Sequence, residues 1–198
     1  MSHAEHTMST VIDLPATFGQ IDIYLFDQLL KGRITAADRV LDAGCGSGRN
    51  LYYLMKMGCH VSAVDANPAA IRGVQELAVE LHTGLPSRNF RVEPIEALSF
   101  DAASFDVVVA NAVLHFARDD AHFEAMVRSM WRVLRPGGML FARLASTILP
   151  DMHFTYLVSP EQLEQLTAAL GGQLLDPLKT TVVHGQRSMT TWVVRTAG

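Results

Sequence analysis

Apolar residues first gather in this chain at helical spacing, over residues 18–34. They follow one another at intervals of three or four residues and form two stripes of a helix. The first stripe contains Phe18, Ile21, Leu25 and Leu29, and the second contains Ile23, Phe26 and Leu30. A helix that is apolar on several sides must be covered, or must cover something else. We therefore expect residues 18–34 to form a capping helix.

Beyond residue 38, short apolar runs alternate with amphipathic helical segments. Strands are predicted at residues 39–43, 60–65, 89–93, 105–110, 138–144, 174–183 and 188–195, the last two joined by a turn at 184–186. Helices are predicted at residues 51–58, 67–82, 119–134 and 159–171. This alternation is typical of a parallel sheet with helices on both faces. Ligands of such sheets bind at the carboxyl ends of the strands.

The length of 198 residues suits one domain. Residues 1–17 are largely polar and are expected to be a mobile lead-in. Residues 18–198 are expected to form a single domain. It consists of the capping helix, a cofactor-binding core at 38–145, and a C-terminal helix and hairpin at 146–198.

Composition narrows the class of protein. The net charge of −4 disfavours a nucleic-acid binder. No apolar run reaches the roughly 18 residues that a membrane-spanning helix needs. Two cysteines make no disulfide framework, so a cytoplasmic location is expected. The histidines and cysteines show no zinc-binding spacing, and no metal is expected.

The most informative segment is Val40-Leu-Asp-Ala-Gly-Cys-Gly-Ser-Gly48, in which a predicted strand runs into three glycines and then a helix. Glycine allows a sharp turn and lets a ligand approach the main chain, and a helix start offers free N–H groups. Asp65 ends the next strand, where a carboxylate can accept both hydroxyls of a ribose. A nucleoside-containing cofactor is therefore expected.

Two cofactors fit this pattern, a nicotinamide dinucleotide and S-adenosylmethionine. The dinucleotide motif G-x-G-x-x-G requires glycine at its sixth position, where this chain has Arg49. Asp42 has no role in holding a pyrophosphate, whereas a carboxylate suits a ligand with a cationic amino-acid end. The spacing favours S-adenosylmethionine and leaves a nicotinamide-dependent reductase as the weaker alternative.

At this point the sequence resembles the class I S-adenosylmethionine-dependent methyltransferases. Four segments match in order: residues 40–48, Val64-Asp-Ala-Asn-Pro68, residues 105–115 and Leu134-Arg-Pro-Gly-Gly138. The segment Gly48-Arg49-Asn50-Leu51 is similar to the tellurite-resistance and small-molecule branch. The resemblance implies a Rossmann-like, seven-stranded parallel sheet with an antiparallel last strand in a three-layer α/β/α arrangement.

The resemblance also implies roles for individual residues. Gly44, Cys45 and Gly46 would lie against the methionyl part of the cofactor, with Asp42 behind its ammonium group. Asp65 would bind the ribose hydroxyls and Ala66 would border the adenine. Asn111 and Ala112 would line the methionyl and substrate side. The third motif departs from the family pattern, because Pro94 stands where an aspartate usually binds the adenine amino group. Glu96 could replace that aspartate, with the Ile95 N–H reaching an adenine ring nitrogen.

Catalytic and substrate-binding residues are less clearly marked. His115 follows the fourth strand and is the candidate general base, since its usual pKa is about 6.5. The alternative is that His115 caps a helix or fills the pocket wall. Tyr24, Arg143, His153 and Tyr156 are candidates for lining the substrate site. Cys45, between two glycines, is expected to pack as a small residue rather than act as a nucleophile.

The sequence predicts a methyltransferase that acts on an O, N or S atom of a small, mostly apolar or aromatic molecule and releases S-adenosylhomocysteine. Residue 111 is not followed by the Pro-Pro-aromatic motif of enzymes that methylate adenine or glutamine. Neither a nucleic-acid nor a membrane partner is expected, and the protein is expected to be a monomer or a homodimer. A regulatory protein that binds the cofactor without turnover is the second alternative.

Overall fold

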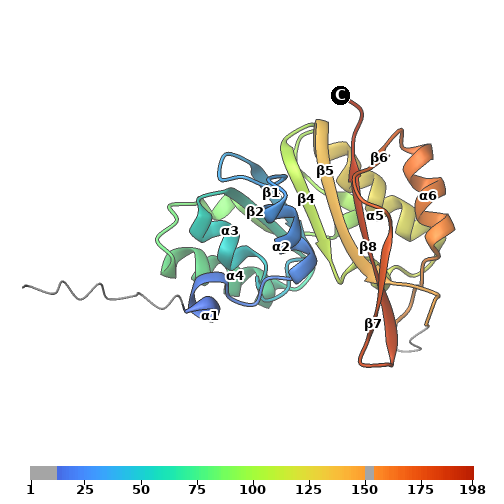
Figure 1. The fold of residues 1–198 in the computed structure, drawn as a ribbon. Helices are drawn as coiled ribbons and strands as arrows, with labels where there is room; N and C mark the ends of the chain where they lie inside the picture. Colours follow the sequence, from blue (N-terminus) through green and yellow to red (C-terminus); the bar gives the residue numbers. More distant parts are fainter. Residues whose placement is uncertain (1–12, 150–153) are drawn as a thin grey trace, which may run out of the picture.

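The computed structural model describes residues 13–149 and 154–198. Within these residues, eight strands form one sheet in the order β3-β2-β1-β4-β5-β8-β6, and β7 pairs with β8 (Figure 1). Strands β1 to β5 are parallel, while β8 is antiparallel to its neighbours β5, β6 and β7. The strands are β1 (Arg39–Ala43), β2 (His60–Asp65), β3 (Phe90–Val92), β4 (Phe105–Asn111), β5 (Leu134–Ala145), β6 (Gln173–Leu174), β7 (Lys179–Val183) and β8 (Arg187–Arg195). The predicted parallel sheet with its antiparallel last strand is confirmed.

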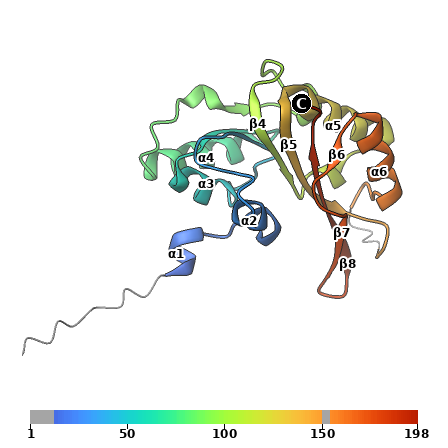
Figure 2. The same cartoon turned by 45° about the horizontal axis from the view of Figure 1, so that its top comes forward.

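Helices cover both faces of the sheet, as Figures 1 and 2 show. One apolar core joins the sheet to α2 (Ile23–Leu30), α3 (Leu51–Met57) and α4 (Pro68–Glu80). A second core joins the opposite face to α5 (Asp120–Val133) and α6 (Pro160–Ala169). Three short 3₁₀ turns, η1 (Ser87–Asn89), η2 (Ile95–Ala97) and η3 (Leu114–Phe116), lie in the connections. The structure therefore has the predicted three layers.

The prediction of one capping helix over residues 18–34 is wrong in its bounds, because the helix that covers the sheet here begins at Ile23 and ends at Leu30. Two helices occupy this region, α1 (Leu14–Phe18) and α2. Gly19 ends α1 with a positive φ of 63°, and the Asp22 carboxylate starts α2 by accepting the Tyr24 N–H. Residues 14–17 of the predicted lead-in belong to α1, and residues 1–12 lie outside the described residues.

Two differences concern the strands. The predicted strand 174–183 is divided into β6 and β7 on either side of Pro177, a residue that lacks the N–H needed for a ladder, which gives eight strands instead of seven. β5 begins at Leu134 rather than at Gly138, and its register with β4 shifts after Phe105. The residues before Gly138 are thus accommodated as a bulge in the strand.

The carboxyl ends of β1, β2 and β4 meet at one edge of the sheet, because these strands are parallel neighbours. Asp42 of β1 pairs with Ala63 of β2 and with Val109 of β4. Val109 lies two residues before Asn111, the last residue of β4. This edge brings the glycine-containing loop, Asp65 and Asn111 together. Among the helices of the described residues, none is long and apolar enough to cross a membrane.

Candidate functional site

A cavity of about 440 Å³ lies at this edge of the sheet, and we call it the glycine-loop cavity. Its walls come from the loops after β1, β2, β3 and β4 and from α5. They contain Gly44, Gly46, Asp65, Ala66, Pro94, Ile95, Glu96, Ala112, Val113, Phe116, His122 and Met126. Seven of the ten predicted cofactor-binding residues line this one cavity: Gly44, Gly46, Asp65, Ala66, Ile95, Glu96 and Ala112.

The loop after β1 presents bare backbone to this cavity. Gly44 and Gly46 have φ angles of 80° and 50°, in the region that favours glycine. A Cβ on Gly44 would lie 2.4 Å from Val113, whereas one on Gly46 would meet no protein atom within 4 Å. Gly44 is therefore required by packing. The space beside Gly46 is available to a ligand that approaches the main chain.

Asp65 is held in a fixed orientation at the end of β2. One carboxylate oxygen, Oδ2, accepts the Gly46 N–H at 2.9 Å, and Oδ1 accepts the Asn67 N–H at 2.8 Å. Each oxygen retains a further acceptor site, because a carboxylate oxygen can accept two hydrogen bonds. The side chain is thus oriented to accept two ligand hydroxyls at the cavity wall.

Asp42 lies buried beneath the same loop, and neither of its carboxylate oxygens has a hydrogen-bond partner among residues 13–149 and 154–198. Burial raises the pKa of Asp42 to about 7. Nearby Arg49 opposes this effect, and the neighbouring Asp65 charge adds to it. An unpaired buried carboxylate is costly. A cationic group on a bound ligand would compensate this cost.

Asn111 lies at the end of β4 on the same face of the sheet as Asp42. Its Oδ1 accepts a hydrogen bond from Arg49 Nη2 at 2.9 Å, while its Nδ2 is buried and has no partner among the described residues. Arg49 also lies 3.6 Å from the buried carboxylate of Asp22. Beside the glycine-loop cavity, Asn111 is therefore partly satisfied, whereas the Asp42 carboxylate has no hydrogen bond from the described residues.

Cys45 does not line the cavity. Its side chain is buried in the core beneath α2, α3 and α4. Burial raises the pKa of the Cys45 thiol far above its usual range, and the charges of Asp42 and Asp65 add to this effect. The thiol stays protonated and is a poor nucleophile, so the structure supports the packing role expected from the sequence.

The far end of the cavity contains Ile95, Glu96 and His122. His122 Nδ1 accepts the Arg118 N–H at 3.1 Å, so in the neutral ring the proton is on Nε2. Nε2 faces Glu96 Oε1 at 3.1 Å. His122 was not identified from the sequence, because its spacing marks only a helix face; Asp119 caps that helix by accepting the His122 N–H.

His115 lies behind the cavity wall rather than in it. Its ring is 2% exposed and packs against the rings of Phe116 and Phe154, with centroid distances of 4.7 and 4.1 Å. Nδ1 accepts the Ala145 N–H at 3.3 Å. This hydrogen bond places the proton of the neutral ring on Nε2, where His115 is a donor. The predicted role of His115 as a base stays a prediction.

The three predicted substrate-lining residues that the structure describes do not all lie together. Tyr24 and Arg143 meet on the α2 face, where the Arg143 guanidinium lies 4.9 Å from the centre of the Tyr24 ring. Tyr156 lies on the opposite face, stacks on Phe123 and donates a hydrogen bond to Asp120 at 2.7 Å. His153 lies outside the described residues. The described residues contain no cluster of three or more histidine, cysteine or carboxylate side chains that could hold a metal ion.

Comparison with known proteins gives the family. The profile of the methyltransferase-domain family matches residues 41–142, just over half of the chain. A ubiquinone biosynthesis O-methyltransferase from Methylocella silvestris is 40% identical over 116 residues, which cover 59% of this chain and 43% of the relative. A malonyl-[acyl-carrier protein] O-methyltransferase from Enterobacter lignolyticus is 29% identical over 68% of this chain and 55% of its own length. The chain thus spans about half the length of these curated relatives.

Solved structures share the fold at low identity. A 1,6-didemethyltoxoflavin-N1-methyltransferase from Burkholderia thailandensis, bound to S-adenosylhomocysteine, has a TM-score of 0.72 and 20% identity over 94% of this chain and 82% of its own. TehB from Haemophilus influenzae has a TM-score of 0.72 and 21% identity over 86% of this chain and 62% of its own. The [4+2]-cyclase SpnF is also similar, with a TM-score of 0.70 and 16% identity over 87% of this chain and 81% of its own. Because the profile matches just over half of the chain, the chain belongs to the methyltransferase-domain family, and its sheet has the fold of the solved methyltransferases.

Proposed function

We propose that this protein transfers a methyl group from S-adenosylmethionine to an O, N or S atom of a small molecule. The observation that carries the proposal is the glycine-loop cavity, in which Asp65, Gly46 and Glu96 surround one space of about 440 Å³. The unpaired carboxylate of Asp42 supports the same cofactor, whose methionyl end carries an ammonium group. Residues 18–198 act in this proposal as one domain.

The residues of the chain would divide the work of binding. Asp65 accepts the ribose hydroxyls, Glu96 accepts the adenine amino group, and Asp42 compensates the ammonium group. The bare backbone at Gly46 lets the methionyl chain lie close to the loop. S-adenosylmethionine supplies an electrophilic methyl carbon on its sulfonium. A bond from the acceptor atom to that carbon forms as the S–C bond breaks and its electron pair stays on sulfur.

The protein's contribution to the rate would be mainly positioning. Holding two reactants in line can lower a barrier by up to about 7–11 kcal/mol. Ala112 lines the cavity just beyond β4 and adopts a positive φ of 60°, and its presence in the cavity wall supports a position beside the methionyl chain. A base is needed only when the acceptor carries a proton of high pKa. His115 is the candidate for that role.

Formation of S-adenosylhomocysteine from S-adenosylmethionine and a panel of phenols, carboxylates, amines and thiols tests the proposal. Acceptor-dependent release of S-adenosylhomocysteine is the expected result. Binding of S-adenosylmethionine without release for any acceptor would instead favour a regulatory protein. The similar fold of SpnF, a [4+2]-cyclase, means that the fold alone does not identify methyl transfer. Equilibrium dialysis with labelled NADH tests the reductase alternative, for which we expect no binding.

A further inference from the structure

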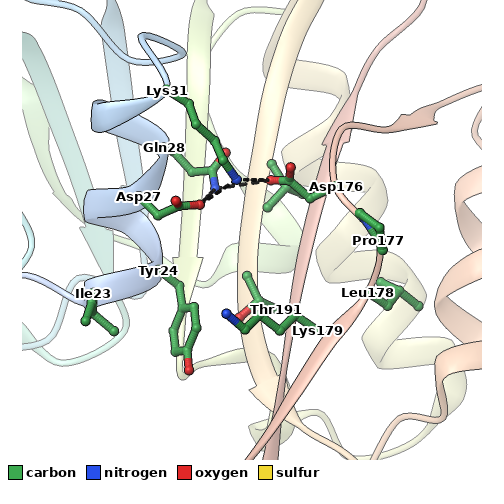
Figure 3. A pocket seen from close by; sticks show the side chains of 11 residues that line it. Ile23, Tyr24, Asp27, Gln28, Lys31, Asp176, Pro177, Leu178, Lys179 and Thr191 are labelled. Atoms are coloured by element: carbon green, nitrogen blue, oxygen red, sulfur yellow. Dashed lines mark hydrogen bonds and ion pairs between the residues drawn. The ribbon is translucent and has the colours of Figure 1, made fainter.

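A second and larger cavity, of about 610 Å³, lies on the α2 face of the sheet, and we call it the α2–β8 cavity. It is enclosed by α2, the connection between β6 and β7, and the adjoining parts of β7 and β8 (Figure 3). Ile23, Pro177, Leu178 and Val193 give it apolar walls, and Tyr24 contributes an aromatic ring. Its volume is in the range of small-molecule sites. It shares no lining residue with the glycine-loop cavity.

At one end of the α2–β8 cavity, the charged side chains pair with one another. Lys31 pairs with Asp27 and Asp176, and Arg33 pairs with Asp176 at 2.5 Å. Burial alone would raise the pKa of Asp176, but the hydrogen bonds from Arg33 and Lys31 outweigh it and lower the pKa. These groups satisfy one another, as the dashed lines in Figure 3 show for Lys31 and its partners. This end offers little charge to a ligand.

The other end is cationic and incompletely satisfied. The Tyr24 ring has the Arg143 guanidinium 4.9 Å from its centre and the Lys179 ammonium 5.1 Å from it. No carboxylate of the described residues lies within ion-pair distance of Lys179. The Thr191 hydroxyl and the Arg143 Nε–H are buried and have no hydrogen-bond partner in the part of the chain that the structure describes. Figure 3 shows Tyr24, Lys179 and Thr191 together at this end.

The strand register connects this end to the edge where methyl transfer is proposed. Lys179 pairs with Thr191, Thr191 with Arg143, and Arg143 with Asn111. Residues that lie opposite each other on neighbouring strands point to the same face of a sheet. A row of polar side chains therefore crosses β7, β8, β5 and β4. It ends one residue before Ala112, which lines the glycine-loop cavity.

Charge along this row favours an anion. The carboxylate of Asp22 is the partner of two guanidinium groups, at 3.1 Å from Arg143 and 3.6 Å from Arg49. Lys179 adds a third positive charge, and Thr191 supplies a hydroxyl that can donate. A charge-assisted hydrogen bond is about twice as strong as a neutral one. An amine would be repelled by the same cations, although the apolar walls would accept its body.

We propose that the α2–β8 cavity binds the methyl acceptor, and that this acceptor is an aromatic or otherwise apolar small molecule carrying a carboxylate. Its apolar body lies against Tyr24, Leu178 and Val193, and its carboxylate lies at Lys179 and Thr191, toward Arg143. This assignment rests on the proposed methyltransferase function. It adds the substrate class and two specificity-determining residues, Lys179 and Thr191, that the sequence pattern did not single out.

Calorimetric titration with a matched pair of ligands tests this proposal on the unmodified protein saturated with S-adenosylhomocysteine. The pair is 1-hydroxy-2-naphthoate and its carboxamide, which differ in charge and hardly in shape. The carboxylate is expected to bind about tenfold more tightly than the amide, as for a hydrogen bond to a charged group. Equal affinity of the two ligands, or no binding of the carboxylate, would overturn the proposal.

Variants locate the effect in the α2–β8 cavity. Lys179→Met is expected to abolish most of the preference for the carboxylate, and Thr191→Val to weaken carboxylate binding several-fold while hardly changing amide binding. Lys56→Met removes the same charge on α3, outside this cavity, and should leave the preference intact. A preference that survives Lys179→Met, or one that Lys56→Met abolishes equally, would refute the assignment.

Two further readouts separate this inference from the proposed function. Titration of S-adenosylhomocysteine alone reports on the glycine-loop cavity, and its affinity should not change in Lys179→Met. If the carboxylate preference is present but no acceptor is methylated, the ligand class stands and the methyltransferase proposal fails. If methylation occurs with amines and neutral phenols but shows no preference for carboxylates, the ligand class is refuted and the enzyme proposal stands.

Discussion

The glycine-loop cavity and the α2–β8 cavity differ in how the chain builds them. The first is built from backbone turns and carboxylates at the ends of neighbouring parallel strands, with Asp65 and Glu96 in its walls and Asp42 buried beneath its glycine loop. The second is built from α2 and from strands near the C-terminus, and its polar end is cationic. The contrast suits two ligands of opposite character, a cofactor with a cationic amino-acid end and an anionic acceptor.

The largest effect is expected at Asp65. Asp65→Ala removes the acceptor for the ribose hydroxyls and should weaken cofactor binding by about 1–3 kcal/mol, the usual cost of unsatisfied polar partners. Titration with S-adenosylhomocysteine measures the change, and Asp101→Ala on an exposed loop is the control. Binding of the naphthoate probe to the α2–β8 cavity should not change. Unaltered cofactor affinity would remove Asp65 from the site.

Substitution of Asp42 should have opposite effects on the stability of the free protein and on its affinity for the cofactor. The pKa of Asp42 is raised from 3.8 to about 7, mainly by burial, so the folded chain binds this proton more tightly than the unfolded chain. The resulting stability is present below about pH 4 and is lost as pH rises through about 7. Asp42→Asn should therefore make the free protein more stable at about pH 8, as thermal unfolding would show, and should weaken binding of S-adenosylhomocysteine.

The pH dependence of cofactor binding is a second measure of Asp42. A cation bound beside the carboxylate favours its ionised form, so affinity in the unmodified protein should rise between about pH 6 and pH 7.5. The profile of Asp42→Asn should be flat over this range. Parallel profiles in the two proteins would show that no ligand cation interacts with Asp42.

Substitution of His115 tests whether methyl transfer to the acceptor needs a general base. A carboxylate acceptor is already deprotonated at neutral pH, and Nδ1 of His115 is engaged with the Ala145 N–H. We expect His115→Asn to lower kcat less than tenfold, with cofactor affinity unchanged. A general base contributes typically about 10²–10⁴-fold. A fall in that range, with a normal melting temperature, would restore the base role predicted from the sequence.

The smallest effect is expected at His122. His122→Asn removes the ring whose Nε2 lies 3.1 Å from Glu96 Oε1. It should weaken cofactor binding two- to fivefold, about 0.5–1 kcal/mol, because Glu96 loses the polar neighbour that orients it. Glu96→Gln should have a similar effect, and the double variant should add little because the two residues act together. His82→Asn is the control, since His82 lies outside the cavity at a φ of 51° that asparagine tolerates. Fully additive effects would show that the two residues act independently.

Most of the glycine-loop cavity could be predicted from the sequence because its parts are local. Gly44 and Gly46 follow one strand directly, Asp65 ends the next, and parallel neighbours place their carboxyl ends together. The sheet was predictable for the same reason, since each strand carries its own apolar run. Only the interruption at Pro177 and the extension of β5 to Leu134 escaped the pattern.

The acceptor side was not predictable in the same way. Lys179, Thr191 and Arg143 become neighbours only through the pairing of β5, β7 and β8. Each is an ordinary strand residue when read in sequence. Tyr156 is a case in which sequence position misleads. It follows the fifth strand, which suggested the substrate site, but its side chain stacks on Phe123, on the face of the sheet opposite to α2. Register and strand order are long-range properties that residue spacing does not encode.

A crystal structure of the protein with S-adenosylhomocysteine is the most direct test of the central assignment. We expect the ribose hydroxyls on Asp65, the adenine beside Ala66 and Ile95, and the methionyl chain along Gly46 with its ammonium toward Asp42. Density for the nucleoside in the α2–β8 cavity, or side chains filling the space beside Gly46, would contradict it.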